Sequence, residues 1–140
     1  MFMNDLSIIV RHMRVFAERS LKQYDIGFPE QAVIMYLISH GKSNQRHIAE
    51  NFGIDQGAIT KTITKLETKG LITRNINPKN RREKIISLTP QAKTLQEELG
   101  KTYQQWSTAI FKNISPEQRN SFEETINKMA NNSATLLSED

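Results

Sequence analysis

The segment Asn77–Ala92, with the sequence NPKNRREKIISLTPQA, constrains the fold of this chain more than any other stretch. Pro78 and Asn80 mark a turn. The segments on either side, Leu71–Ile76 and Lys84–Leu88, predict the two strands of a hairpin. Four cationic side chains cluster around the turn: Lys79, Arg81, Arg82 and Lys84. A cationic hairpin tip is a poor core element, but it suits contacts with phosphates or with a minor groove.

Hydrophobic periodicity predicts helices over most of the remaining chain. The expected helices are Asn4–Tyr24, Pro29–Gly41, Asn44–Phe52, Gln56–Lys69, a long helix from Pro90 and a last helix from Pro116. Asp55 and Thr89 are suited to N-cap positions, and Ser115 with Gln118 has the pattern of a capping box. The fold class is therefore expected to be mainly α with a small β-wing: a winged helix-turn-helix lobe with long N- and C-terminal helices.

The two helices before the hairpin have the pattern of a helix-turn-helix motif. The side chains expected to point inward are Ile48, Phe52, Ile54 and Ile59, and Gly53 suits the turn. The opposite face of the second helix carries groups that can bond to base edges or reach phosphates. The candidate DNA-contacting residues are Asn44, Gln45, Gln56, Gly57, Thr60, Lys61, Thr64, Lys65, Lys79, Arg81, Arg82 and Lys84. An ordinary helical hairpin with a solvated threonine-lysine face would have a similar pattern.

The placement of charge also favours nucleic acid. Residues 41–84 carry ten Lys and Arg against four Asp and Glu, a net charge of +6. Residues 1–40 are neutral and residues 85–140 carry −2, which gives the chain its total of +4. A basic middle between neutral and acidic ends is typical of a nucleic-acid-binding core, although a solvated surface remains the simpler alternative for charge alone.

Together these residues resemble the MarR (multiple antibiotic resistance regulator) family of winged-helix transcription factors. The segments that carry the resemblance are Ile48-Ala49-Glu50, Leu66–Ile72 (LETKGLI), Arg74, Asn80-Arg81-Arg82, and Leu88-Thr89 with Ala92. The stretch Leu66–Ile72 is similar to the family's L-E-x-x-G-L-[VI] helix end, and Asn80–Arg82 is similar to its D-x-R wing tip. Asn80 stands where the family has an aspartate, which implies a more positive wing tip without an aspartate–arginine ion pair.

The resemblance implies one MarR-like chain over residues 1–140. Residues 28–88 would form the winged lobe, while residues 1–27 and 89–140 would interlock with a second copy. A homodimer of this kind would read two half-sites of a pseudo-palindromic operator about one helical turn apart. Family members are mostly cytoplasmic repressors released by a small anionic or aromatic molecule. The candidate effector-binding residues are Arg11, His12, Met13, Phe16, Met35 and Tyr36.

Composition excludes several other classes. The chain has no cysteine, so disulfides, thiolate zinc sites and thiol-based sensing are excluded. His12, His40 and His47 lack metal-ligand spacing, and we expect neither a metal nor a cofactor. We expect no enzymatic activity, because the sequence has no phosphate-binding loop and no nucleophile motif. No apolar run approaches the length of a membrane span, and the first residues do not predict a signal peptide.

The sequence therefore predicts a sequence-specific regulator that binds double-stranded DNA and responds to an effector. Two alternatives remain open at this point. One is a winged-helix module that binds proteins and no longer reads an operator. The other is a DNA-binding protein without an effector, controlled by its own concentration.

Overall fold

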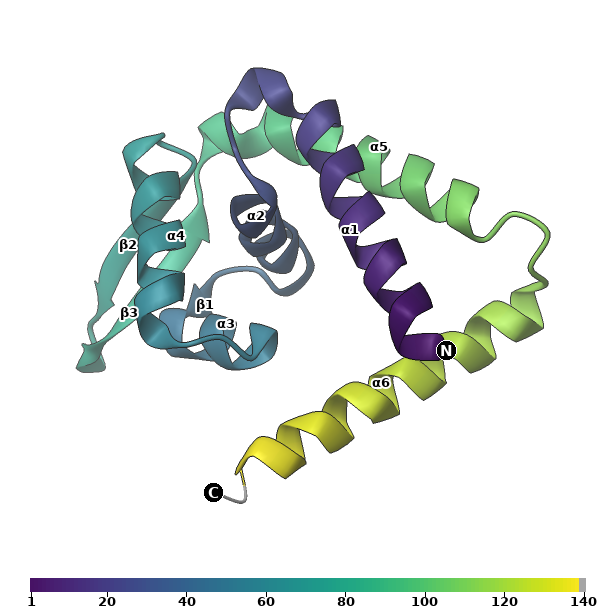
Figure 1. The fold of residues 1–140 in the computed structure, drawn as a ribbon. Coiled ribbons are helices and arrows are strands. Elements are labelled where there is room, and N and C mark those ends of the chain that lie inside the picture. Colours follow the sequence, from purple (N-terminus) through teal and green to yellow (C-terminus); the bar gives the residue numbers. More distant parts are fainter. Residues whose placement is uncertain (139–140) are drawn as a thin grey trace. The chain divides into compact units, whose positions relative to one another are not determined.

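The computed structural model describes residues 1–138 of the chain, which has two compact units (Figure 1). The first unit is Met1–Trp106 and the second is Ser107–Asp140. The boundary falls within helix α5 (Lys93–Ile110).

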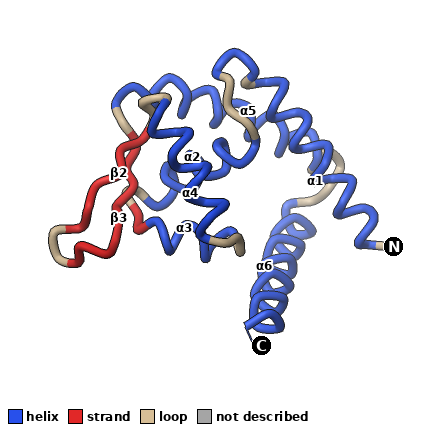
Figure 2. Tube along the Cα trace, turned by 60° about the vertical axis from the view of Figure 1, so that its left-hand side comes forward, coloured by secondary structure: helices blue, strands red, loops and turns tan. Residues whose placement is uncertain are grey.

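The first unit is mainly helical with one small sheet, which confirms the predicted fold class. Its elements in chain order are α1 (Phe2–Ser20), η1 (Lys22–Tyr24), α2 (Phe28–His40), β1 (Ser43–Asn44), α3 (Gln45–Phe52), α4 (Gln56–Thr68), β2 (Ile72–Asn77), β3 (Asn80–Leu88), η2 (Pro90–Ala92) and most of α5. The hairpin of β2 and β3 extends beyond the helices of this unit (Figure 2).

The hydrophobic core of the first unit surrounds α2, which packs against both α1 and α4 (Figure 1). The largest fully buried side chains are Leu21, Val33, Ile34, Ile48, Ile59, Ile63, Leu66, Ile72, Ile86 and Leu95. Three of them, Ile59, Ile63 and Leu66, follow one face of α4 at helical spacing. Their burial fixes the rotation of α4, so its polar face is turned to solvent.

The sheet is antiparallel, with the strand order β1-β3-β2. The sequence does not predict β1, because a two-residue strand between helices has no periodic pattern of its own. The predicted start of the second hairpin strand at Lys84 is wrong, since β3 begins at Asn80. Arg81 and Arg82 consequently lie on a strand and not in the turn, which consists of Pro78 and Lys79.

Local side-chain bonds confirm one predicted cap in this unit and contradict the other. Asp55 Oδ1 accepts a hydrogen bond from Ala58 N at 2.7 Å at the start of α4. Thr89 makes no side-chain cap, and its hydroxyl donates to Gly70 O at 2.7 Å. This bond ties the end of the hairpin to the end of α4, and the following helix opens with the 3-10 turn η2.

Two further predictions for this unit are wrong. The first helix ends at Ser20, and Tyr24 lies in the separate 3-10 turn η1 because Leu21 leaves helical geometry and becomes fully buried. Ile54 is 42% exposed instead of pointing inward. It follows Gly53, whose left-handed conformation (φ 63°) turns the chain away from the core.

The second unit contains the end of α5 and helix α6 (Pro116–Ser138). Its predicted capping box is confirmed: Ser115 N donates to Gln118 Oε1 at 3.0 Å, and Gln118 N donates to Ser115 Oγ at 3.1 Å. The Phe111 and Phe122 rings lie 6.2 Å apart between centroids. Within its described residues α6 has no buried side chain, and its apolar residues Phe122, Met129 and Leu136 are exposed.

Candidate nucleic-acid interface

Backbone caps hold α3 and α4 in a helix-turn-helix arrangement. Asn44 Oδ1 accepts a hydrogen bond from Arg46 N at 2.8 Å, so Asn44 is the N-cap of α3. Gly53 ends α3 in the left-handed conformation, and Asp55 then caps α4. The first turn of α4 lies at the positive end of the helix dipole, where Asp55 already accepts a hydrogen bond from Ala58 N.

The outer face of α4 carries the predicted DNA contacts. The residues Gln56, Gly57, Thr60, Lys61, Thr64 and Lys65 are all exposed. The opposite face is fully buried at Ile59, Ile63 and Leu66. This division gives the helix one structural face and one face that can enter a groove of DNA, as a recognition helix requires.

Several of these side chains already have partners within the lobe. Gln45 Nε2 donates to Thr60 Oγ1 at 2.9 Å, so two predicted contacts bond to each other. Lys65 Nζ lies 3.1 Å from Oε1 of Glu30, a side chain only 9% exposed. Lys61 has no ion pair within residues 1–138. Of the two lysines on this face, Lys61 is therefore the one whose charge is not compensated.

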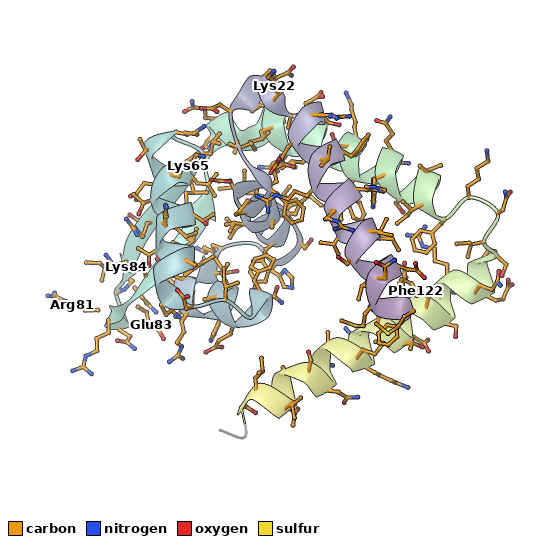
Figure 3. All side chains as sticks on the ribbon, viewed as in Figure 1. Lys22, Lys65, Arg81, Glu83, Lys84 and Phe122 are labelled. Atoms are coloured by element: carbon orange, nitrogen blue, oxygen red, sulfur yellow. The ribbon has the colours of Figure 1, made fainter. Side chains whose placement is uncertain are left out.

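The wing has an irregular register that carries its arginines outward. Ile76 pairs with Lys84, but the next residue, Asn77, pairs with Asn80. The residues of β3 that this shift leaves without opposite neighbours are Arg81, Arg82 and Glu83. A strand with extra residues bulges, and its side chains are redirected. Arg81, Glu83 and Lys84 project from the outer part of the hairpin (Figure 3).

Asparagine side chains hold the tip of the wing. Asn77 Oδ1 accepts a hydrogen bond from Lys79 N at 3.0 Å, and Asn80 Oδ1 accepts one from Arg82 N at 3.1 Å. Asn77 Nδ2 also donates to Glu83 Oε2 at 3.0 Å. Asn80 thus makes the local backbone bond that an aspartate could make, without adding a negative charge next to Arg82.

The start of α3, the start of α4 and the wing border one shared groove. The residues that line it are Asn44, Gln45, Arg46, Gln56, Asn80, Arg82, Glu83 and Lys84. Five of these are predicted DNA contacts, which the structure brings together from four separate elements. Lys79 and Arg81 are exposed nearer the wing tip, and Gly57 and Thr60 lie on the outer face of α4.

The remaining predicted contacts lie along a different groove. Lys61, Thr64 and Lys65 line it together with Phe28 and Ile54. The face of α4 is therefore shared between two grooves, and only the first of them includes the wing.

Three residues that line the first groove, which includes the wing, were not among the candidate DNA contacts, namely Arg46, Asn80 and Glu83. Arg46 follows two predicted contacts in the first turn of α3, so helical geometry could have indicated it. Glu83 is an acid within a basic run, and only the bulged register explains its presence in the groove.

A second candidate site is a cavity of about 390 Å³ within the first unit. Its walls are mostly aromatic and methionine side chains. Four predicted effector contacts line it, namely Met13, Phe16, Met35 and Tyr36. The residues that the sequence did not indicate are Ala17, Phe28, Gln31, Ala32, Ser39, His40, Asn51, Phe52, Leu99, Thr102, Tyr103 and Trp106. The other two candidates, Arg11 and His12, are exposed on α1 and do not line the cavity.

Residues 1–138 bring together no group of three or more His, Asp or Glu side chains that could hold a metal ion. None of the helices in the same range has the length and hydrophobicity of a membrane span.

Comparison with known proteins identifies the same lobe. The model of the MarR family matches residues 29–84. A crystal structure of MarR is 26% identical with a TM-score of 0.83, and the match covers 100% of this chain and 95% of that one. MepR from S. aureus in complex with DNA is 22% identical with a TM-score of 0.84, covering 94% of this chain and 98% of that one. CouR from Rhodococcus jostii RHA1, bound to p-coumaroyl-CoA, is 22% identical with a TM-score of 0.80, covering 89% and 88%.

Proposed function

The chain belongs to the MarR family of transcriptional regulators, and from that premise we propose that it is a homodimeric, sequence-specific repressor that binds double-stranded DNA and is released by a small molecule. The observation that carries this proposal is the groove in which Asn44, Gln56 and Arg82 meet from three different elements. Such a convergence of amides and a guanidinium beside two helix starts suits a nucleic-acid backbone and the base edges next to it.

The two parts of this surface would have different tasks on DNA. The first turn of α4 would enter the major groove, where the Gln56 amide can pair with an adenine edge. Arg81 and Arg82 would reach the adjacent minor groove, whose negative potential favours arginine. Lys79 and Lys84 would neutralise phosphates, each contributing close to one unit to the salt dependence of binding.

A second copy of the chain is the partner that the exposed apolar residues require. In the first unit, α1 exposes Phe2, Ile9 and Val10. In the second unit, α6 exposes Phe122 and Met129 along a helix without buried residues among those described. Helices with uncovered apolar side chains at both ends of a chain favour a two-fold dimer, in which the same faces of two copies cover each other.

The aromatic cavity is the proposed effector site. Its volume lies within the range of small-molecule sites, about 300–1,000 Å³, and it combines the predicted contacts Phe16 and Tyr36 with Trp106. CouR, which has a similar fold, binds p-coumaroyl-CoA, and this supports a small-molecule response in the present protein as well. A regulator of this kind would act in the cytoplasm.

Selection of the purified chain against a random duplex pool, read at two salt concentrations, tests the proposal. The expected result is an enriched site with two-fold symmetry and half-sites about one helical turn apart. Salt-sensitive binding without an enriched sequence would overturn operator reading and favour a protein-interaction module instead. Sedimentation of the same sample tests the dimer independently, since a monomer at micromolar concentration would contradict it.

A further inference from the structure

Glu30 is a buried carboxylate at the start of α2. The residue is 7% exposed, and it is the third residue of that helix. Its Oε1 lies 3.1 Å from Nζ of Lys65 on α4. Within residues 1–138, Glu30 Oε2 is buried and has no hydrogen-bond partner. The Lys65 ammonium and the positive end of the α2 dipole are therefore what compensates this carboxylate for its lost hydration.

The backbone around Glu30 leaves its side chain little room to move away from α4. Gly27 is the N-cap residue of α2, and a Cβ atom at this position would lie 3.0 Å from Glu30 Oε2. The side chain thus folds back over the start of its own helix. One carboxylate oxygen occupies the space beside Gly27, and the other oxygen faces Lys65.

Lys65 belongs to the outer face of α4, one turn after Lys61 (Figure 3). Its side chain is 47% exposed, so a phosphate could approach its ammonium group. Moving the ammonium to a phosphate would leave a buried carboxylate unpaired, whereas keeping it in place would bring the phosphate beside that carboxylate. Loss of a buried ion-pair partner is strongly destabilising, while an exposed ionic contact returns far less. Lys65 should therefore stay with Glu30 when DNA binds.

The ion pair between Arg46 and Glu50 on α3 provides a contrast within the same motif. Arg46 Nε lies 3.6 Å from Glu50 Oε1, but the two side chains are 63% and 64% exposed. An exposed pair contributes little, so Arg46 can exchange its carboxylate for a phosphate at almost no cost. The burial of the acid, and not pairing as such, is what distinguishes Lys65 from Arg46.

From this geometry we propose that Glu30 is a positioning residue of the DNA-binding face, which withholds Lys65 from phosphate and leaves Lys61 as the lysine of α4 that meets DNA. This inference rests on the proposed function, because it takes the outer face of α4 as the surface that binds DNA. Lys65, which the sequence predicts as a DNA contact, here joins α4 to α2 instead. A phosphate contact adds affinity without sequence information, so Glu30 limits the affinity of the protein for any duplex.

Fluorescence anisotropy with a short duplex of arbitrary sequence, repeated over a range of salt concentrations, tests the inference on the full chain. The forms compared are wild type, Glu30→Gln and Glu30→Gln/Lys65→Ala. Glu30→Gln frees Lys65, so this variant should bind more tightly at low salt, with a salt dependence steeper by close to one unit for each bound lobe. For each lobe it should lose about threefold more affinity than wild type when salt is raised about fourfold. The double variant should return to the wild-type salt dependence.

Net charge alone does not produce this pattern. Wild type and the double variant have the same net charge, and the matched control Glu50→Gln has the same net charge as Glu30→Gln. Because Arg46 can already leave its exposed partner, Glu50→Gln should keep the wild-type salt dependence. A salt dependence as steep in Glu50→Gln as in Glu30→Gln would overturn the inference, since net charge would then account for the effect.

A purely structural ion pair would give a different result. Glu30→Gln would then bind no more tightly than wild type and with the same salt dependence, against the inference. A shallower salt dependence in the double variant than in wild type would also contradict it, because Lys65 would already contact DNA beside Glu30. The comparison does not need Lys65→Ala alone, which would leave the buried carboxylate without a cation and destabilise the fold.

The same titrations separate this inference from the proposed function. If wild-type protein binds no duplex at any salt concentration, the proposed function fails and the role of Glu30 fails with it. If wild-type protein binds with a strong salt dependence, but Glu30→Gln is not steeper, DNA binding stands and only the role of Glu30 fails.

Discussion

The inner and outer ends of the hairpin differ in almost every physical respect. At the inner end, Ile72 and Ile86 are buried in the core, and the Thr89 hydroxyl is bonded to Gly70. At the outer end, Ile76 is 59% exposed, and Arg81 has no carboxylate partner within residues 1–138. The inner end of the hairpin therefore contributes to the hydrophobic core, whereas the outer end carries exposed cations.

The cations of the hairpin and of the adjoining end of α4 follow the same division. Near the inner end, Arg74 lies 3.2 Å from Glu67, and Lys69 pairs with Asp25. The wing cations have no ion pair in the described chain, and the nearby acid Glu83 bonds to Asn77 instead. Charge that is already paired gains little from a phosphate, whereas unpaired charge retains its full attraction. Stability and DNA affinity should consequently respond to different substitutions within this hairpin.

The largest effect should follow from Ile86→Ala at the inner end. The side chain is fully buried, so its loss leaves a cavity in the core and should lower the free energy of unfolding by about 2–5 kcal/mol. Denaturant unfolding measures this loss. The matched control Ile76→Ala, on the exposed outer part, should change stability by less than about 0.5 kcal/mol. Similar losses in the two variants would contradict the division between the ends.

Arg82→Ala at the outer end should have the opposite profile. It should weaken operator binding by about 1–3 kcal/mol, because Arg82 is a proposed groove contact, and it should leave the unfolding midpoint unchanged. Fluorescence anisotropy with the selected operator measures the affinity. Lys22→Ala, an exposed cation on η1 shown in Figure 3, makes the same change in net charge and should have little effect. Near-wild-type affinity of Arg82→Ala would remove the wing from the mechanism.

Sequence patterns predict most of this architecture because its elements have strong local causes. The buried stripe Ile59, Ile63 and Leu66, the Asp55 cap and the Ser115–Gln118 box are each complete within a few residues. Such signals do not depend on the rest of the fold. The predictions that are wrong concern residues whose conformation depends on tertiary contacts. The sequence predicts Thr89 as a helix cap, but its hydroxyl donates a hydrogen bond to Gly70 O, which is distant in sequence.

The candidate sites divide in the same way. The wing and the face of α4 could be predicted because each is continuous in sequence and has an obvious charge or polarity. The cavity could be predicted only in part, since Gln31, Phe52 and Trp106 come from three helices whose packing no local pattern indicates. Arg11 lies on α1 but does not line the cavity, because a suitable charge on a helix does not determine which way that side chain faces.

Arg74→Ala tests whether the paired cations of the inner end stabilise the fold without contributing to DNA binding. Its side chain is 19% exposed and packs beside Glu67, so its loss should lower the free energy of unfolding by about 1 kcal/mol. The salt dependence of DNA binding should not change. A cycle with Glu67→Ala isolates the pair, because the double variant should lose less than the two single variants combined. A reduced salt dependence in Arg74→Ala would mean that Arg74 reaches DNA despite its carboxylate.

The smallest and most informative change is Asn80→Asp at the outer end. An aspartate retains the oxygen that accepts from Arg82 N, so local geometry should persist while one negative charge is added to the tip. If the positive charge of the wing determines its affinity for DNA, the variant should make about one phosphate contact fewer. Wild-type protein would then lose about threefold more affinity than the variant when salt is raised fourfold. Asn80→Ala is the matched control, since it removes the acceptor without adding charge and should leave the salt dependence unchanged. Tighter binding by Asn80→Asp would reverse the interpretation, because it would mean that an aspartate–arginine pair orders the wing and that order contributes more than the lost positive charge.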